Sequence, residues 1–158
     1  MSGAEPFRPF RERVAEDEAQ VIAFHIGGEL HACDVQLVEE VVTRRRVHRL
    51  PDMPARLLGV LRLRGELVPV VDIAPLLDLK LEAEQPAIIV AAIGEVRVGV
   101  AVDAAHEVVT LTPTEYRPAP LTGGERDQFV VGVARVDGKL VNLLDVAEML
   151  REQPVGSG

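Results

Sequence analysis

The sequence repeats itself, and the repeat limits what the chain can fold into. Residues 59–77, GVLRLRGELVPVVDIAPLL, align without a gap with residues 132–150, GVARVDGKLVNLLDVAEML, and nine of the nineteen positions are identical. Upstream, residues 28–42 are echoed more loosely by residues 94–109, so the two copies are offset by about 66 to 73 residues. This offset is longer than the period of solenoid repeats. The sequence therefore predicts two small, related lobes.

Both copies have the pattern of short strands joined by tight turns. Valine- and leucine-rich runs are separated by turns at Gly27-Gly28, Arg64-Gly65 and Asp137-Gly138, and such turns favour hairpins. Each half offers about five short strands at spacings that suit a small closed barrel. Closure also removes the exposed sheet edges that invite aggregation. We therefore predict a mainly β fold with two five-stranded β-barrel subdomains side by side and a few short helices.

Composition divides the chain into an arm, two lobes and a tail. Residues 1–20 are charged and lack periodicity, which predicts a mobile N-terminal arm or, alternatively, a short helix that docks on a partner. The lobes are expected at about residues 21–84 and 85–150, with their strands either consecutive or interleaved. An acidic stretch, 82–86, links them. Residues 151–158 read as a flexible C-terminal tail.

Charge and hydropathy exclude several classes of partner. The chain has a net charge of −8, which repels phosphate backbones and anionic lipids, so we expect no nucleic acid partner. No stretch reaches the ~18 apolar residues of a membrane span, and the N-terminus lacks the apolar run of a signal peptide. We therefore expect a cytoplasmic protein without direct membrane insertion. The single cysteine, Cys33, lies in an apolar run and is expected to be buried and unreactive.

The residues that enzymes use are absent or scattered. Serine occurs only at Ser2 and Ser157, which excludes a serine nucleophile with a positioned base. Asp72 and Asp145 occupy equivalent places in the repeat, which predicts a shared helix-capping role. The histidines lack the spacing of metal ligands and are expected on the surface or on strand faces; they are His25, His31, His48 and His106. We predict no catalytic residue, no metal, no cofactor and no enzymatic activity.

Candidate recognition residues gather at the turn in the first copy of the repeat. Arg64 stands where the second copy has Asp137, and its planar head gains nothing locally from a tight turn. Arg62 and Arg64 lie two apart on one strand and point to one face. With Glu40 they form either a docking surface for an amphipathic helix or an intramolecular surface ion pair, worth ~0 to 1 kcal/mol. The sequence leaves both interpretations open.

The order of these segments resembles the CheW-like domain of bacterial chemotaxis coupling proteins. The resemblance runs from about Val21 to Leu150, and its most specific element is the Gly-Val-x-x-Leu-Arg-Gly-x-x-x-Pro-Val-x-Asp run over residues 59–72. The chain departs from the pattern at Arg62, where the family often has Asn. The run Arg44-Arg45-Arg46 is also unusually basic for the family.

The resemblance implies a non-catalytic adaptor built from two SH3-like barrels. Such an adaptor couples the cytoplasmic tip of a methyl-accepting chemoreceptor to the regulatory domain of a CheA-type histidine kinase. The receptor helix is expected in the groove between the barrels, and the receptor-binding candidates are Val38, Glu40, Gly59, Arg62 and Arg64. By the same resemblance, the kinase-binding candidates are Arg117 and Leu121. The competing hypotheses are a small-ligand sensor module with a site between two β-barrels and a self-assembling structural protein.

Overall fold

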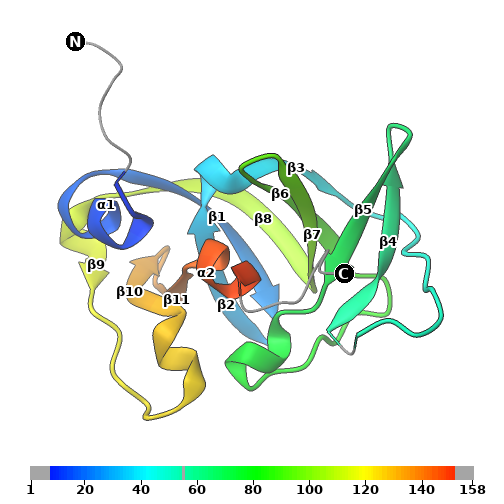
Figure 1. The fold of residues 1–158 in the computed structure, drawn as a ribbon. Helices are drawn as coiled ribbons and strands as arrows, with labels where there is room; N and C mark the ends of the chain where they lie inside the picture. The colour runs from blue at the N-terminus through cyan, green and yellow to red at the C-terminus, as the bar shows by residue number, and fades with distance from the viewer. Residues whose placement is uncertain (1–7, 55, 152–158) are drawn as a thin grey trace.

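A computed structural model describes residues 8–54 and 56–151 of the protein (Figure 1). The strands are β1 (Ala19–Ile26), β2 (Glu29–Asp34), β3 (Val38–Val42), β4 (Leu57–Leu63), β5 (Glu66–Val71), β6 (Ala87–Ile93), β7 (Val96–Val102), β8 (Ala104–Leu111), β9 (Tyr116–Arg117), β10 (Val130–Val136) and β11 (Lys139–Leu144). The α-helices are α1 (Phe10–Glu16) and α2 (Val146–Arg151), and the 3-10 helices are η1 (Val35–Leu37), η2 (Ala74–Leu77), η3 (Pro113–Glu115) and η4 (Glu125–Gln128). The predicted mainly β fold is confirmed. None of the helices in these ranges has the length and apolar character that a membrane crossing requires.

The strands form two sheets that lie side by side (Figure 1). Sheet A has six strands in the order β8-β1-β2-β11-β10-β9, and sheet B has five in the order β3-β6-β7-β5-β4. The sixth strand of sheet A, β9, is two residues long, and its counterpart beside β4 is the isolated bridge between His48 and Val60. Two β units side by side are present as predicted, although sheet A has six strands instead of five. Over the described ranges, however, neither strand order closes into a barrel, because each ends in two outer strands.

The two halves of the chain exchange hairpins. Sheet A joins hairpin β1–β2 from the first half to hairpin β10–β11 from the second, and sheet B joins β6–β7 from the second half to β4–β5 from the first. The joints, β2 with β11 and β7 with β5, are parallel pairs in equivalent places. The strands are therefore interleaved along the chain. A division near residue 84 does not coincide with the boundary between the sheets.

The aligned copies also share their local structure. Hairpins β4–β5 and β10–β11 each contain a register shift next to a glycine that both copies possess, Gly59 and Gly132. A Cβ atom at Gly59 would lie 2.4 Å from the carbonyl oxygen of His48, and one at Gly132 would lie 2.2 Å from Cε1 of Tyr116. Glycine is required at both bulges because another segment of the chain lies directly against them.

The equivalent aspartates begin equivalent turns. Asp72 Oδ1 accepts a hydrogen bond from the Ala74 N–H at 2.9 Å, and Asp145 Oδ1 accepts one from the Glu148 N–H at 3.0 Å. These bonds start η2 and α2, which both pack on the core between the sheets. The predicted capping role is confirmed for Asp145 only. Asp72 stands one residue before Ile73, the N-cap of η2, so it binds the first N–H of η2 without being its N-cap.

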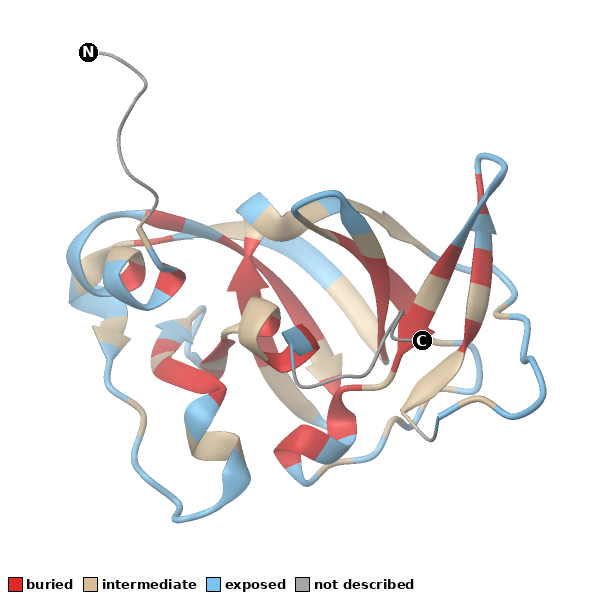
Figure 2. Ribbon diagram, in the orientation of Figure 1, coloured by how far each residue is buried: buried red, intermediate tan, exposed pale blue. Residues whose placement is uncertain are grey.

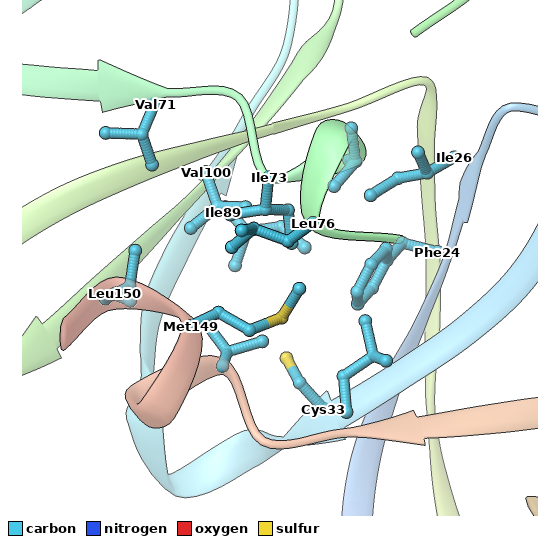
Figure 3. Packing of buried hydrophobic residues seen from close by; sticks show 14 of the residues in the cluster. Phe24, Ile26, Cys33, Val71, Ile73, Leu76, Ile89, Val100, Met149 and Leu150 are labelled. Atoms are coloured by element: carbon cyan, nitrogen blue, oxygen red, sulfur yellow. The ribbon is translucent and has the colours of Figure 1, made fainter. Parts of the chain in front are cut away.

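Among the residues that the structure describes, the buried apolar side chains form three layers, and Figure 2 shows their buried strands. The largest layer lies between the sheets and includes Phe24, Cys33, Ile89, Val100 and Met149 (Figure 3). A second lies inside sheet A, and a third lies inside sheet B. Inner strands are therefore covered on both faces, which explains why residues 87–93 are apolar without alternation.

Part of the predicted N-terminal arm is a packed helix. Phe10 and Val14 lie one helical turn apart on α1 and are buried in the layer inside sheet A. Arg13 of the same helix pairs with the Asp34 carboxylate on β2. The expectation of a mobile arm is therefore corrected for residues 8–20, because two apolar side chains and an ion pair fix the helix. Residues 1–7 and, in the predicted tail, 152–158 lie outside the described residues.

Candidate interaction surface

The turn between β4 and β5 presents Arg64 to solvent. Arg64 has a φ of 50° and Gly65 of 81°, and the second copy has 51° at Asp137 and 77° at Gly138. Positive φ at both central residues is the geometry of a type I′ turn, which suits aspartate or glycine better than arginine. Arginine there costs about 1 kcal/mol of backbone strain. Even so, 64% of its side chain remains exposed.

Arg64 and Glu40 join the two edges of sheet B. Glu40 lies on β3 and Arg64 follows β4, the outer strands of the sheet, and the Arg64 guanidinium donates to Glu40 Oε2 at 2.5 Å. This hydrogen bond lowers the pKa of Glu40 and raises the pKa of Arg64. Arg45 adds a second link, because it donates to the carbonyl oxygen of Arg62 at 2.6 Å. Side-chain hydrogen bonds therefore connect the β3 and β4 ends of sheet B, which are not paired by backbone hydrogen bonds.

Arg97 on β7 extends this charged surface. Its Nε lies 2.9 Å from Glu39 Oε1, and its Nη1 lies 2.7 Å from Glu66 Oε1. Exposed pairs of this kind contribute about 0 to 1 kcal/mol each, so they add little stability and leave a patterned surface of both charges. The sequence-based reasoning missed Arg97 and Glu66. The only signal was a charged residue inside an otherwise apolar strand.

The remaining receptor-side candidates have different surroundings. Arg62 is exposed on β4. Val38, at the start of β3, is half-buried and packs against the layer between the sheets. Gly59 is buried under the loop that follows β3, where the backbone of His48 covers it. The structure thus places Glu40, Arg62 and Arg64 at the surface of sheet B, whereas Val38 and Gly59 are largely covered.

One kinase-side candidate, Leu121, lines a groove of about 430 Å³ on sheet A, and the other, Arg117, lines a neighbouring groove. Arg117 ends β9 and donates to the carbonyl oxygens of Thr114 at 2.9 Å and Tyr116 at 2.8 Å. Leu121 follows in the next loop and is 84% exposed. Leu140 on β11 also lines the groove and is 63% exposed. This groove therefore offers unpaired apolar surface, in contrast to the charged surface on sheet B.

The space between the sheets is filled by the protein itself. The pocket lined there by Phe24, Cys33 and Val146 has a volume of about 10 Å³, at the lower limit for a single water molecule. A metabolite has no room at this place. The hypothesis of a sensor with its ligand between two barrels therefore gains no support from the packing.

Groups with strongly shifted pKa values are buried in the core. His31 has no exposed surface, and burial, reinforced by the charge of Arg126, lowers its pKa to about 4. It lies on β2, so the strand-face alternative of the prediction applies, with the ring completely buried. Burial raises the pKa of Cys33 to about 12, so the thiol stays protonated, as predicted. Over residues 8–54 and 56–151, no three potential ligand side chains are grouped to hold a metal ion.

Comparisons with known proteins agree with one another. The model of the CheW-like domain matches residues 20–153. The chain is 30% identical over 141 residues to the probable chemotaxis protein CheW of Rhizobium etli, with 87% of this chain and 90% of that protein covered. It is 29% identical over 144 residues to the chemotaxis protein CheW of Thermotoga maritima, with 89% and 93% covered. Among solved structures, it is similar to the scaffolding protein TtCheW from Thermoanaerobacter tengcongensis, with a TM-score of 0.70, 27% identity, and 80% of this chain and 88% of that chain covered.

Proposed function

The chain belongs to the CheW-like domain family, and from this premise we propose that it is a non-catalytic adaptor that couples chemoreceptors to a CheA-type histidine kinase. The names of its relatives, chemotaxis protein and scaffolding protein, support the proposal. One surface would hold the cytoplasmic tip of a methyl-accepting receptor, and another the regulatory domain of the kinase. The adaptor would work in the cytoplasm, recruited to receptor arrays, and would need no cofactor.

Two exposed surfaces of different chemistry support this function. The charged surface around Arg64 lies on sheet B, and the apolar groove beside Leu121 lies on sheet A. An adaptor acts by holding two partners in a fixed geometry, so its effect on kinase rate comes from interface free energies. Such an adaptor needs separate surfaces that two partners can occupy together. The observation that carries the proposal is the exposed Arg64–Glu40 pair, held at a turn that arginine strains.

Charge reversal at Arg64 tests the receptor surface. The variant Arg64→Glu places a carboxylate beside Glu40, and we expect at least about a tenfold loss of receptor affinity, which corresponds to about 1.4 kcal/mol. Stability should change by less than about 1 kcal/mol, because the lost pair is exposed. Co-sedimentation with receptor-containing membranes measures binding, and circular dichroism with urea denaturation measures folding.

Two further variants separate recognition from local structure. Arg135→Glu reverses an exposed arginine on β10 of sheet A, and it should leave receptor binding unchanged. The exchange Glu40→Arg with Arg64→Glu keeps an ion pair but swaps its ends, and it should bind the receptor as poorly as Arg64→Glu alone. Full receptor binding by folded Arg64→Glu would refute this surface. Full recovery in the swapped variant would show that the pair only closes sheet B.

The kinase surface has its own test. Leu121→Asp places a charge on a side chain that is 84% exposed, so the fold should be unaffected. We expect weaker binding of the kinase regulatory domain and unchanged receptor co-sedimentation. Loss of both interactions, or of neither, would contradict the assignment of separate surfaces.

A further inference from the structure

Four arginines of the loop between β3 and β4 line one cleft. Arg44, Arg45, Arg46 and Arg49 border a space of about 520 Å³, which we call the arginine cleft, together with Leu58 on β4 and Glu84 from the linker before β6. The cleft lies beyond the end of β3 and is distinct from the groove on sheet A. Cationic side chains close together repel one another. Their gathering in one concave place therefore calls for an anionic occupant.

The charge of this loop is opposite to that of the rest of the chain. Residues 43–56 contain five arginines and one aspartate, a net charge of +4, in a chain whose total is −8. Within the described ranges, no carboxylate lies within ion-pair distance of the cleft arginines, whereas Arg64 and Arg97 each have one or two carboxylate partners. The cleft thus combines positive charge with free hydrogen-bond donors.

The loop is held in place before any partner arrives. His48 and Val60 exchange two backbone hydrogen bonds of 2.8 Å, which fix the loop to β4. Val47 packs against the core inside sheet B. Arg45 is anchored by its bond to the Arg62 carbonyl oxygen. Preorganised donors bind an anion with less loss of conformational entropy than donors on a mobile loop.

Arg44, which lines the cleft, has a strained backbone conformation. Arg44 has a φ of 57°, a conformation that glycine or asparagine adopts at lower cost. An arginine at this position retains a cationic side chain in the cleft despite the strain.

We propose that the arginine cleft binds an acidic segment of a protein partner, a short stretch with two or three carboxylates and an apolar side chain. Guanidinium groups bind carboxylates in bidentate fashion. Leu58, Val47 and Pro86 line the cleft with them and are half-buried, so they can pack against an apolar side chain.

Other polyanions fit the cleft less well. Nucleic acids and anionic vesicles are extended charged surfaces, and the net charge of −8 repels them outside the loop. Glu84 lines the cleft itself, so it opposes a uniformly anionic backbone, whereas a peptide can place its carboxylates toward the arginines and an apolar side chain elsewhere. A space of about 520 Å³ holds a few residues of such a peptide.

The test uses a defined peptide and its uncharged twin. The full-length protein is titrated with the end-blocked peptide Glu-Leu-Glu-Asp and with its end-blocked twin Gln-Leu-Gln-Asn, and binding is measured by calorimetry and by NMR of amides 44–49, 58, 84 and 85. We expect only the acidic peptide of the two to bind, and its affinity should fall with added salt. The variant Arg46→Glu with Arg49→Glu should bind at least about tenfold more weakly. The charge-matched control, Arg135→Glu with Lys139→Glu, should bind within about twofold of the wild type.

Several outcomes would overturn the proposal. These are equal binding of both peptides, unchanged affinity in Arg46→Glu with Arg49→Glu, or shifts confined to amides outside the cleft. Binding of a 12-nucleotide single-stranded DNA or of anionic vesicles, but not of the acidic peptide, would assign the cleft to a different class of partner. The inference does not rest on the adaptor function. Arg64→Glu, which tests the receptor surface, should leave peptide binding unchanged, and Arg46→Glu with Arg49→Glu is judged by peptide binding alone.

Discussion

His31 makes the protein sensitive to acid, and the size of the effect follows from its surroundings. The imidazole on β2 has no exposed surface, and over the described ranges neither ring nitrogen has a hydrogen-bond partner. Its neighbours are the Phe24 ring, with a centroid separation of 5.8 Å, and the Glu29 carboxylate, 3.8 Å from Nε2. Burial is the largest cause of the lowered pKa, and the charge of Arg126 also disfavours a second proton. The opposing influence is the backbone of Ile26, which does not reach hydrogen-bond geometry. The neutral ring is therefore the folded form.

The folded and unfolded proteins bind the second proton of the His31 ring at different pH values. The pKa of His31 is about 4 in the folded protein, against the ordinary value of 6.5 that the unfolded chain retains. Below pH 6.5 the unfolded state takes up the proton first, so stability falls as the pH is lowered and the loss is complete below pH 4. Each pH unit between these values costs about 1.4 kcal/mol, so the total is about 3 kcal/mol. At pH 4.5, about 2.5 kcal/mol of it should be lost.

Urea denaturation of wild type and His31→Leu at pH 7.5 and pH 4.5 measures this contribution. Leucine has a similar volume and no proton to bind, so His31→Leu should lose about 2.5 kcal/mol less on acidification than the wild type. Carboxylates titrate in both proteins and cancel in the comparison. At pH 7.5 the variant should be at least as stable, because two unpartnered ring nitrogens are removed. If both proteins lost the same free energy within about 0.5 kcal/mol, the buried neutral ring would be refuted.

Three further predictions concern packing and buried groups. In urea denaturation, the free energy of unfolding should fall by about 1 to 3 kcal/mol in Gly59→Ala and in Gly132→Ala. It should change little in the control Gly124→Ala, whose Cβ would have its nearest neighbour at 3.6 Å. Equal losses in all three variants would contradict the close approach at the bulges. Asp103 accepts hydrogen bonds from three backbone N–H groups, at positions 27, 82 and 83. Asp103→Ala should therefore lower the free energy of unfolding by about 2 kcal/mol and speed hydrogen exchange at these three amides. Unaltered exchange at all three would count against this role. The Cys33 thiol should not react with dithiobis(nitrobenzoate) at pH 8 until urea unfolds the protein. Rapid reaction in the folded protein would disprove its burial.

Local signals in the sequence predicted local structure well. The two-residue turns at 64–65 and 137–138 have the positive φ values that their hairpins require, and Asp72 and Asp145 begin equivalent helical turns. The exchange of hairpins could not be predicted, because valine-rich strands pair equally well with any similar strand. The partner of β2 lies more than a hundred residues away in the chain. Helix α1 was hidden for a related reason, since only Phe10 and Val14 mark its apolar face among many charges.

One contact at the candidate surface was predicted, as one of two open alternatives. The pairing of Glu40 with Arg64 follows from two opposite charges on facing segments, and the structure contains that pair. Gly59 was grouped with them by the motif alone, whereas its surroundings show a packing requirement, the close approach of His48. Arg97 became part of the surface through strand pairing, because β7 lies beside β5, which carries Glu66, and the arginine also pairs with Glu39 on β3. Pairing between distant strands leaves no local pattern.

The exchanged hairpins have a consequence for synthesis on the ribosome. The first hairpin is complete at residue 34, but β8 and β11, its neighbours in sheet A, are finished only at residues 111 and 144. Until then the apolar faces and unpaired edges of β1 and β2 remain open to other chains. A truncated product that stops before β10 would therefore be prone to aggregation and a target for chaperones or proteases. Translation through the last strand is thus a condition for a folded protein.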